Sequence, residues 1–374
     1  MLTALVAAPS VSSARPGLDQ GNRPVIDLLA GWLDDLGFSC EVMPIPDRPG
    51  KANLIATLGR GPGGLVLAGH TDTVPFDAGR WRHDPFTLTV ANGRLYGLGT
   101  ADMKGFFPLA IEAVRGLDAG RLTTPLIVLA TADEETSMSG AKALVAAGRP
   151  AARHAVIGEP TSLKPVHLHK GIMMEAIHIT GRSGHSSDPS QGVNALDAMY
   201  RVLGELMDWR ARLAERYTDA RFKVPVPTLN LGHIHGGDNP NRICPDCTLH
   251  IDLRPLPGMA IEALRAELQE RVTHAVRGSG ATVRFEALFD GVPPLETPRT
   301  APIVRAAEEL TGTPAGAVTF GTEGPFLTAM GMDTVILGPG DLAQAHQPDE
   351  YLALDRIAPT IDLLRNLAHR FCMA

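Results

Sequence analysis

The chain has 374 residues, more than one hydrophobic core usually supports, so we expect two domains. Its 34 Lys and Arg and 41 Asp and Glu give a net charge of −7, scattered rather than gathered into runs, which argues against a nucleic-acid partner. No apolar run approaches the roughly 20 residues needed to cross a bilayer.

Two features bear on the compartment. Residues 1–8 are apolar, but the run is short and no Lys or Arg precedes it, so a secretory signal is not predicted. Four cysteines are too few for a disulfide framework in a chain of this size. Cys244 and Cys247 have the spacing of a redox or zinc hook, yet no second pair completes a four-sulfur site. We expect a cytoplasmic protein whose two neighbouring thiols pack within a strand.

The first part of the chain alternates two kinds of segment. Short apolar runs bounded by turn residues lie at 65–68, 126–130, 155–157 and 335–337, and helix-like stretches lie at 106–117 and 141–147. Continuous apolarity is typical of strands buried on both faces. The pattern therefore predicts an α/β domain with a central sheet.

The middle of the chain has a different order of elements. Strand patterns lie at 172–180, 228–234, 243–253 and 281–288, with amphipathic helices at 193–217 and 261–276. This order is β-α-β-β-α-β, which is ferredoxin-like. We therefore expect a first domain formed by residues 1–170 and 290–374, interrupted by a smaller α+β domain at 171–289.

Histidines and acids follow the predicted buried strands. They are His70, the pair Glu134 and Glu135, Glu159 and, after a Gly-Pro-Gly turn, His346. Sheets of α/β proteins place their active sites at the carboxyl ends of strands. Asp102 lies in a glycine-rich loop at 97–105, whose spacing does not match a phosphate-binding loop.

These residue types favour a pair of metal ions. Two histidines and three carboxylates suit two zinc ions with positions left open for water. Because neighbouring side chains point differently, one of Glu134 and Glu135 can ligate while the other takes the proton of the attacking water. Asp72 can reach back as the acceptor that fixes the tautomer of His70. Taken alone, each of these acids would be interpreted as a solvated surface group or a helix-capping group.

The motifs resemble a known family. The segments LAGHTDTVP, YGLGTADMKGF, LATADEETSMSGA, VIGEPTSL, GRSGHSSDP, LNLGHIHGG, LRPLPG and LGPGDLAQAHQPDEY resemble the zinc-dependent amidohydrolase and exopeptidase family, which includes aminoacylases and desuccinylases. The resemblance covers nearly the whole chain. It implies a zinc-exopeptidase-like catalytic domain with a central mixed sheet, interrupted by a ferredoxin-like dimerisation domain.

The resemblance also implies roles for single residues. Two Zn²⁺ per subunit, replaceable by Co²⁺, would be held by His70 with Glu159 and by Glu135 with His346, and Asp102 would bridge them. Glu134 would be the general base. A cis peptide bond is expected between Asp102 and Met103.

Three further residues are implied to meet the substrate in a homodimer. His185 would contact the scissile carbonyl of the neighbouring subunit's substrate, while Asn241 and Arg254 would help to hold the carboxylate of a substrate. The residues alone leave alternatives open: His185 lies in a turn ahead of a helix and can cap it, and Arg254 can form a surface ion pair. His233 and His235 are interpreted as structural or interface groups.

The implied reaction is hydrolysis of the N-acyl bond of an N-acetyl amino acid, with N2-acetyl-L-ornithine of arginine biosynthesis as the expected substrate. N-acetylcitrulline, succinyl-diaminopimelate and dipeptides are alternatives, as is a binding protein that kept the fold and lost catalysis. Relatives usually carry more of the first helix, so the natural start is expected upstream.

Overall fold

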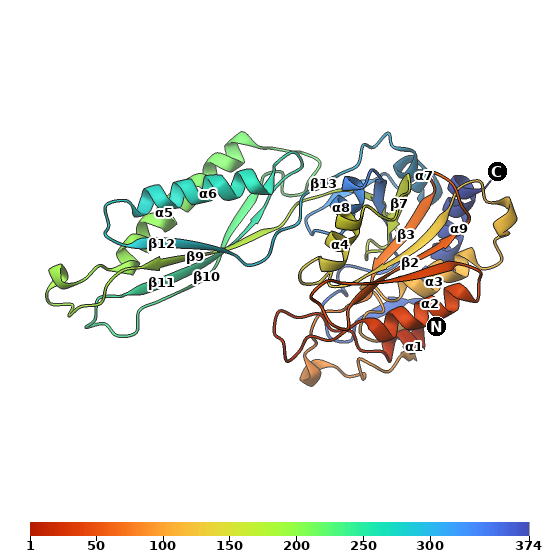
Figure 1. Cartoon of the computed structure of the whole chain (residues 1–374), viewed down its shortest axis with the longest axis horizontal. Helices are drawn as coiled ribbons and strands as arrows, with labels where there is room; N and C mark the ends of the chain where they lie inside the picture. Colours follow the sequence, from red (N-terminus) through yellow and green to blue (C-terminus); the bar gives the residue numbers. More distant parts are fainter. Residues whose placement is uncertain (374) are drawn as a thin grey trace. The chain divides into compact units, whose positions relative to one another are not determined.

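The computed structural model describes residues 1–373. The chain divides into two compact units, of which the first comprises Met1–His167, Glu296–Gly316 and Thr322–Ala374 and the second Leu168–Leu295 and Ala317–Gly321. Within the described residues, no helix is both long and apolar enough to cross a membrane. Each unit is built around its own sheet (Figure 1).

The first unit is organised by a nine-stranded mixed sheet. Its main path runs β1-β2-β6-β3-β7-β15-β8-β13, and β14 pairs with β8. The strands are β1 (Ser39–Pro44), β2 (Ala52–Leu58), β3 (Leu65–His70), β6 (Leu126–Thr131), β7 (His154–Ile157), β8 (Val166–His169), β13 (Leu295–Glu296), β14 (Gly316–Val318) and β15 (Asp333–Ile336). The four central strands, β6, β3, β7 and β15, are parallel. Their carboxyl ends therefore meet at one edge.

Helices cover both faces of this sheet, which explains the continuous apolar runs. Leu65 and Leu67 of β3 belong to a core with α2 (Arg23–Asp34), α3 (Phe106–Val114), α7 (Pro302–Thr311) and α9 (Ile357–Cys372). Val66 and Ala68 point to the opposite core, which contains residues of α4 (Ser139–Ala147) and α8 (Gly324–Ala329). Alternate residues of one strand thus enter two cores.

The remaining elements of the first unit are short. A three-stranded sheet has the order β16-β5-β4. Its strands are β4 (Thr89–Ala91), β5 (Arg94–Tyr96) and β16 (Tyr351–Ala353). The first unit also contains the short helix α1 (Leu2–Val6) and three 3₁₀ turns, at Ala78–Arg80, Ala119–Arg121 and Leu354–Arg356.

The second unit has one four-stranded antiparallel sheet and two long helices. The sheet order is β10-β11-β9-β12, and the elements are β9 (Met173–Thr180), the 3₁₀ turn Pro189–Gln191, α5 (Ala195–Arg216), β10 (Thr228–Gly236), β11 (Asp246–Arg254), α6 (Ile261–Val276) and β12 (Thr282–Ala287). Both helices lie along the sheet (Figure 1) and share its core. The chain order is the predicted β-α-β-β-α-β, so the predicted fold class is confirmed.

The cysteines behave as packing residues. Cys244 and Cys247 are buried and free, and both belong to the core of the second unit. Burial, and then the neighbouring Cys244, raise the pKa of Cys247 to about 11, so this thiol stays protonated at neutral pH. The structure begins β11 at Asp246 rather than at the predicted residue 243.

Candidate metal centre

Parallel pairing brings the predicted residues to one edge of the main sheet. His70 is the last residue of β3 and lies opposite Thr131, the last residue of β6. Glu134 and Glu135 follow β6, and Glu159 follows β7, which pairs with the other side of β3. The strand that ends in His70 therefore has an acidic turn on each side.

The site needs a close approach between a loop and a helix. Gly158 precedes Glu159, and a Cβ atom at this glycine would lie 2.2 Å from the ring of Phe106 at the start of α3. Only glycine fits this approach without a shift of the ring or the chain. The glycine of the GEP segment after β7 is thus explained by its packing against Phe106.

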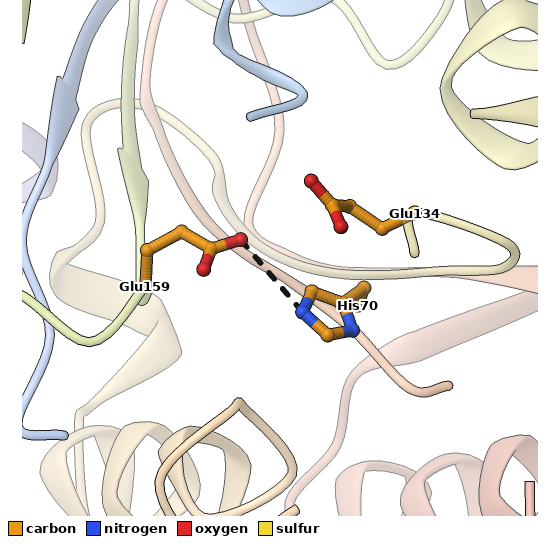
Figure 2. Close-up of side chains that lie close together, drawn as sticks. All are labelled: His70, Glu134 and Glu159. Atoms are coloured by element: carbon orange, nitrogen blue, oxygen red, sulfur yellow. Dashed lines mark ion pairs between the residues drawn. The ribbon is translucent and has the colours of Figure 1, made fainter. Parts of the chain in front are cut away.

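One group of possible ligands surrounds His70 on the side of β7. His70, Glu134 and Glu159 each offer a ligand atom, and these atoms lie within 4.8 Å of one another. Figure 2 shows Glu159 and Glu134 approaching the imidazole from two directions. The Nε2 atom of His70 is 3.7 Å from Oε1 of Glu159. Glu134, the predicted base, is thus itself within reach of an ion at this position.

A second group shares His70 and extends toward His346. His70, Asp102 and Glu135 also have ligand atoms within 4.8 Å of one another. Asp102 lies between the two histidines, with Oδ1 3.1 Å from Nε2 of His70 and Oδ2 3.4 Å from Nε2 of His346. Nε2 of His346 is 3.1 Å from Oε1 of Glu135. Each oxygen of Asp102 therefore faces a different histidine.

Burial and charge show that this set of donors fits cations. Glu159 is 5% exposed, and its Oε1 atom has no hydrogen-bond partner among the described residues. Burial, and then the neighbouring carboxylates, raise the pKa of Glu159 and of Glu134 well above the usual range. Like charges at such distances need a counter-charge. Imidazole nitrogens and carboxylate oxygens together suit zinc and similar divalent ions.

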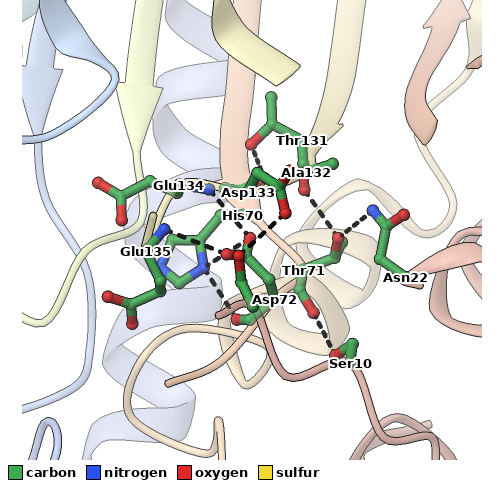
Figure 3. A network of polar contacts seen from close by, with 12 residues as sticks. Ser10, Asn22, His70, Thr71, Asp72, Thr131, Ala132, Asp133, Glu134 and Glu135 are labelled. Atoms are coloured by element: carbon green, nitrogen blue, oxygen red, sulfur yellow. Dashed lines mark hydrogen bonds and ion pairs between the residues drawn. The ribbon is translucent and has the colours of Figure 1, made fainter. Parts of the chain in front are cut away.

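Asp72 orients three neighbours. Its Oδ1 and Oδ2 atoms accept hydrogen bonds from the main-chain N–H groups of Glu134, at 3.2 Å, and Glu135, at 3.1 Å (Figure 3). Nδ1 of His70 is 3.0 Å from the main-chain carbonyl of Asp72, whereas the carboxylate lies 3.6 Å away. Because a carbonyl only accepts, Nδ1 carries the proton and Nε2 is left as the ligand atom. The carboxylate was expected in that role.

The glycine-rich loop is held by an acid that sequence reasoning missed. Glu350 is 1% exposed and accepts hydrogen bonds from the amides of Gly99 at 3.0 Å, Ala101 at 2.8 Å and Asp102 at 2.9 Å. The peptide bond between Asp102 and Met103 is cis, as the resemblance implied. Glu350 belongs to the AHQPDEY motif, but nothing in its spacing indicates which loop it would bind.

The substrate-contacting candidates lie in the second unit. His185 is exposed, and its Nδ1 atom contacts the Ser187 hydroxyl at 2.7 Å. The amide of Ser186 donates to the Asn241 carbonyl at 3.0 Å, so His185 and Asn241 lie on adjoining loops. Arg254 pairs with Asp252 at 2.9 Å at the far end of β11.

Strand length separates Asn241 from Arg254. Asn241 precedes β11, whereas Arg254 is its last residue. A nine-residue strand spans about 26 Å at about 3.3 Å per residue. Side chains at its two ends cannot meet on one carboxylate within a single subunit. The predicted shared role of Asn241 and Arg254 therefore requires two subunits.

Comparison with known proteins identifies relatives of the whole chain. The model of peptidase family M20/M25/M40 matches residues 66–370. A protein of Edwardsiella ictaluri named acetylornithine deacetylase is 53% identical over 369 residues, which cover 99% of this chain and 96% of that protein.

Solved structures share the fold at low identity. An M20 family metallo-carboxypeptidase from Sulfolobus solfataricus has a TM-score of 0.77 at 18% identity, with 98% of this chain and 97% of that chain covered. A dinuclear metal binding peptidase of the M20 family from Bacillus subtilis has a TM-score of 0.69 at 14% identity, with 98% of this chain and 95% of that chain covered.

Proposed function

This chain belongs to peptidase family M20/M25/M40, and we propose that it removes the acetyl group from N2-acetyl-L-ornithine, which yields L-ornithine and acetate in arginine biosynthesis. The observation that supports the reaction class is the double group of ligand atoms that shares His70. The proposed substrate is supported by the 53% identity to a protein named acetylornithine deacetylase and by motifs such as HTDTVP and AHQPDEY.

Two divalent ions fit the proposed centre. His70 and Glu159 would hold one ion, Glu135 and His346 the other, and Asp102 would face both, as its two oxygens already face the two histidines. We expect zinc, with cobalt as a substitute. The chemistry that such a pair supplies is polarisation of the acyl carbonyl and acidification of a water molecule.

Glu134 carries the proton in this scheme. It accepts a proton from the attacking water as the water oxygen bonds to the acyl carbon. It then donates that proton to the leaving nitrogen as the C–N bond breaks. Two features support this role: Glu134 is half-buried beside the ligand atoms, and Asp72 holds its main-chain amide. Burial raises its pKa, which suits a group that must both take and return a proton.

The second unit would supply the groups that bind the substrate. In a homodimer, His185 and Asn241 of one subunit would act on the substrate of the other, with Arg254 as a carboxylate clamp. The separation of Asn241 from Arg254 along β11 supports contributions from two subunits. We also propose a cytoplasmic location, which fits the four free cysteines.

A peptidase function is the second candidate, because the solved structures of the same fold include peptidases. The experiment is steady-state turnover on N2-acetylornithine, N-acetylcitrulline, succinyl-diaminopimelate and dipeptides, before and after chelation. We expect kcat/KM for N2-acetylornithine to exceed that for the others by ~10-fold or more, the scale of pocket discrimination, and to vanish on chelation. A higher kcat/KM for dipeptides would assign a peptidase. An inactive protein with bound metal would indicate a binding function.

A further inference from the structure

The turn that carries Glu134 and Glu135 is fixed from behind by Asp133. Asp133 is 2% exposed and has a φ of 59°, a left-handed conformation that a non-glycine residue adopts at some cost. Its main-chain carbonyl accepts the amides of Ser137 at 3.1 Å and Met138 at 2.7 Å. Its Oδ1 atom accepts the hydroxyl of Ser12 at 2.9 Å. Asp133 is therefore held through both its main chain and its side chain.

A buried lysine completes this arrangement. Lys51 is 6% exposed, and its Nζ atom pairs with the carboxylate of Asp133 and, at 2.7 Å, with Oδ1 of Asp19. Lys51 directly precedes β2, which pairs antiparallel with β6, so the start of β2 lies beside the end of β6. Sheet pairing thus brings a distant lysine to the residue before Glu134.

The turn with the two glutamates is therefore held by two carboxylates, those of Asp72 and Asp133. Asp72 accepts the main-chain amides of the glutamates on one side, and on the other side Asp133, the residue directly before them, pairs with Lys51 (Figure 3 shows Asp72 and Asp133 around the turn). Removing Lys51 would leave Asp133 buried without its cation, which is strongly unfavourable. The turn would then have to move, and both glutamates would move with it.

We propose that Lys51 is a positioning residue, which acts through Asp133 to fix Glu134 for proton transfer and Glu135 for metal binding. The part that concerns turnover rests on the proposed function. The part that concerns metal binding does not, because it needs only the ligand geometry of Glu135.

The first test measures metal binding alone. Cobalt(II) is titrated into the metal-free full-length protein and into Lys51→Met, Asp19→Asn and the exposed control Lys164→Met, with visible absorption and calorimetry as readouts. Lys51→Met should weaken cobalt binding ~10–100-fold, the usual loss when a group supporting a ligand is removed. Asp19→Asn and Lys164→Met should stay near wild type. An unchanged affinity in folded Lys51→Met, or an equal loss in Asp19→Asn, would overturn the proposal.

The second test measures turnover at saturating cobalt. Lys51→Met should lower kcat ~10-fold or more with KM little changed, because only the position of the base is altered. In a Glu134→Gln background the same substitution should change kcat by no more than about 2-fold, since no base remains to be misplaced. Equal losses in both backgrounds would show that Lys51 does not act through Glu134. If the wild type has no deacetylase turnover, the proposed function fails, and the cobalt titration still decides the role of Lys51.

A milder variant covers the case in which Lys51→Met does not fold. Ser139→Ala removes a hydroxyl that donates to Oδ2 of Asp133 at 2.8 Å and leaves the lysine in place. Loss of a hydrogen bond to a charged group should weaken cobalt binding about 3-fold or more. Wild-type affinity in Ser139→Ala would contradict a positioning role for Asp133 and hence for Lys51.

Discussion

Single residues in this centre are defined by their neighbours rather than by their type. Glu134 and Glu135 are adjacent acids whose amides bind the same carboxylate, that of Asp72. Only Glu135 also contacts His346, at 3.1 Å. The two glutamates therefore share one support and differ in what their side chains meet, which makes their roles separable by substitution.

We expect Glu134→Gln to keep its metal and lose its turnover. The substitution preserves shape but removes the proton acceptor, so kcat should fall ~100–10,000-fold with KM little changed. Glu135→Gln should lose metal first and turnover in consequence. Zinc per chain and kcat are measured on both variants, with the exposed Glu215→Gln as a control. Wild-type turnover in Glu134→Gln, or metal loss equal to that of Glu135→Gln, would contradict the assignment of Glu134 as the general base.

At the scale of elements, the loop that carries Asp102 is shaped by one distant carboxylate. Three amides of the loop donate to Glu350, which directly precedes β16. β16 in turn pairs with β5, which directly precedes the loop. Strand pairing thus places Glu350 beneath the loop, and the loop places Asp102 between the two histidines.

Replacing Glu350 should therefore destabilise both fold and centre. Glu350→Ala leaves three buried N–H groups without an acceptor, at about 1–3 kcal/mol each. We expect the free energy of unfolding in denaturant to fall by at least about 3 kcal/mol, with weaker metal binding because Asp102 shifts. For Glu350→Gln, which keeps one acceptor oxygen, we expect a free energy of unfolding between those of Glu350→Ala and wild type. If the free energy of unfolding of Glu350→Ala lay within about 1 kcal/mol of the wild-type value, the loop would keep its conformation without Glu350.

At the scale of the whole molecule, metal binding should be linked to the stability of the first unit. The possible ligands come from segments far apart in the chain, so the complete site exists only in the folded protein. Chelation should abolish turnover and lower Tm, and zinc or cobalt should restore both. Metal at ~100 times its Kd adds about 2.7 kcal/mol to stability. Full turnover in a metal-free sample would contradict the two-metal proposal.

Assembly is tested by mixing two inactive variants. If His185 acts on the partner's substrate, a heterodimer of His185→Ala and Glu134→Gln contains one site with both groups intact. After subunit exchange, an equal mixture should recover roughly a quarter of wild-type turnover, since half the dimers are mixed and each has one working site. Either variant alone, taken through the same exchange, is the control. No recovery in a mixture shown to contain heterodimers would mean that His185 does not act in trans.

Much of the fold could be predicted because its signals are local. The strands at the centre of the main sheet are buried on both faces, so their apolar runs stand out, and residues 261–276 form α6 as predicted. The short strands β4, β5 and β16 were not predicted, because three residues carry no periodicity. Their pairing depends on contacts between distant segments, which a local pattern does not contain.

The residue types and their order along the chain are enough to predict which side chains could form the centre, because a histidine or acid that follows a buried parallel strand lies at the same edge of the sheet as the others. The residues that support these side chains could not be predicted in this way. Lys51, Asp133 and Glu350 act through hydrogen bonds and ion pairs that link positions far apart in the chain. Such contacts arise from the order in which strands pair. Neither the residue types nor their spacing along the chain specifies that order.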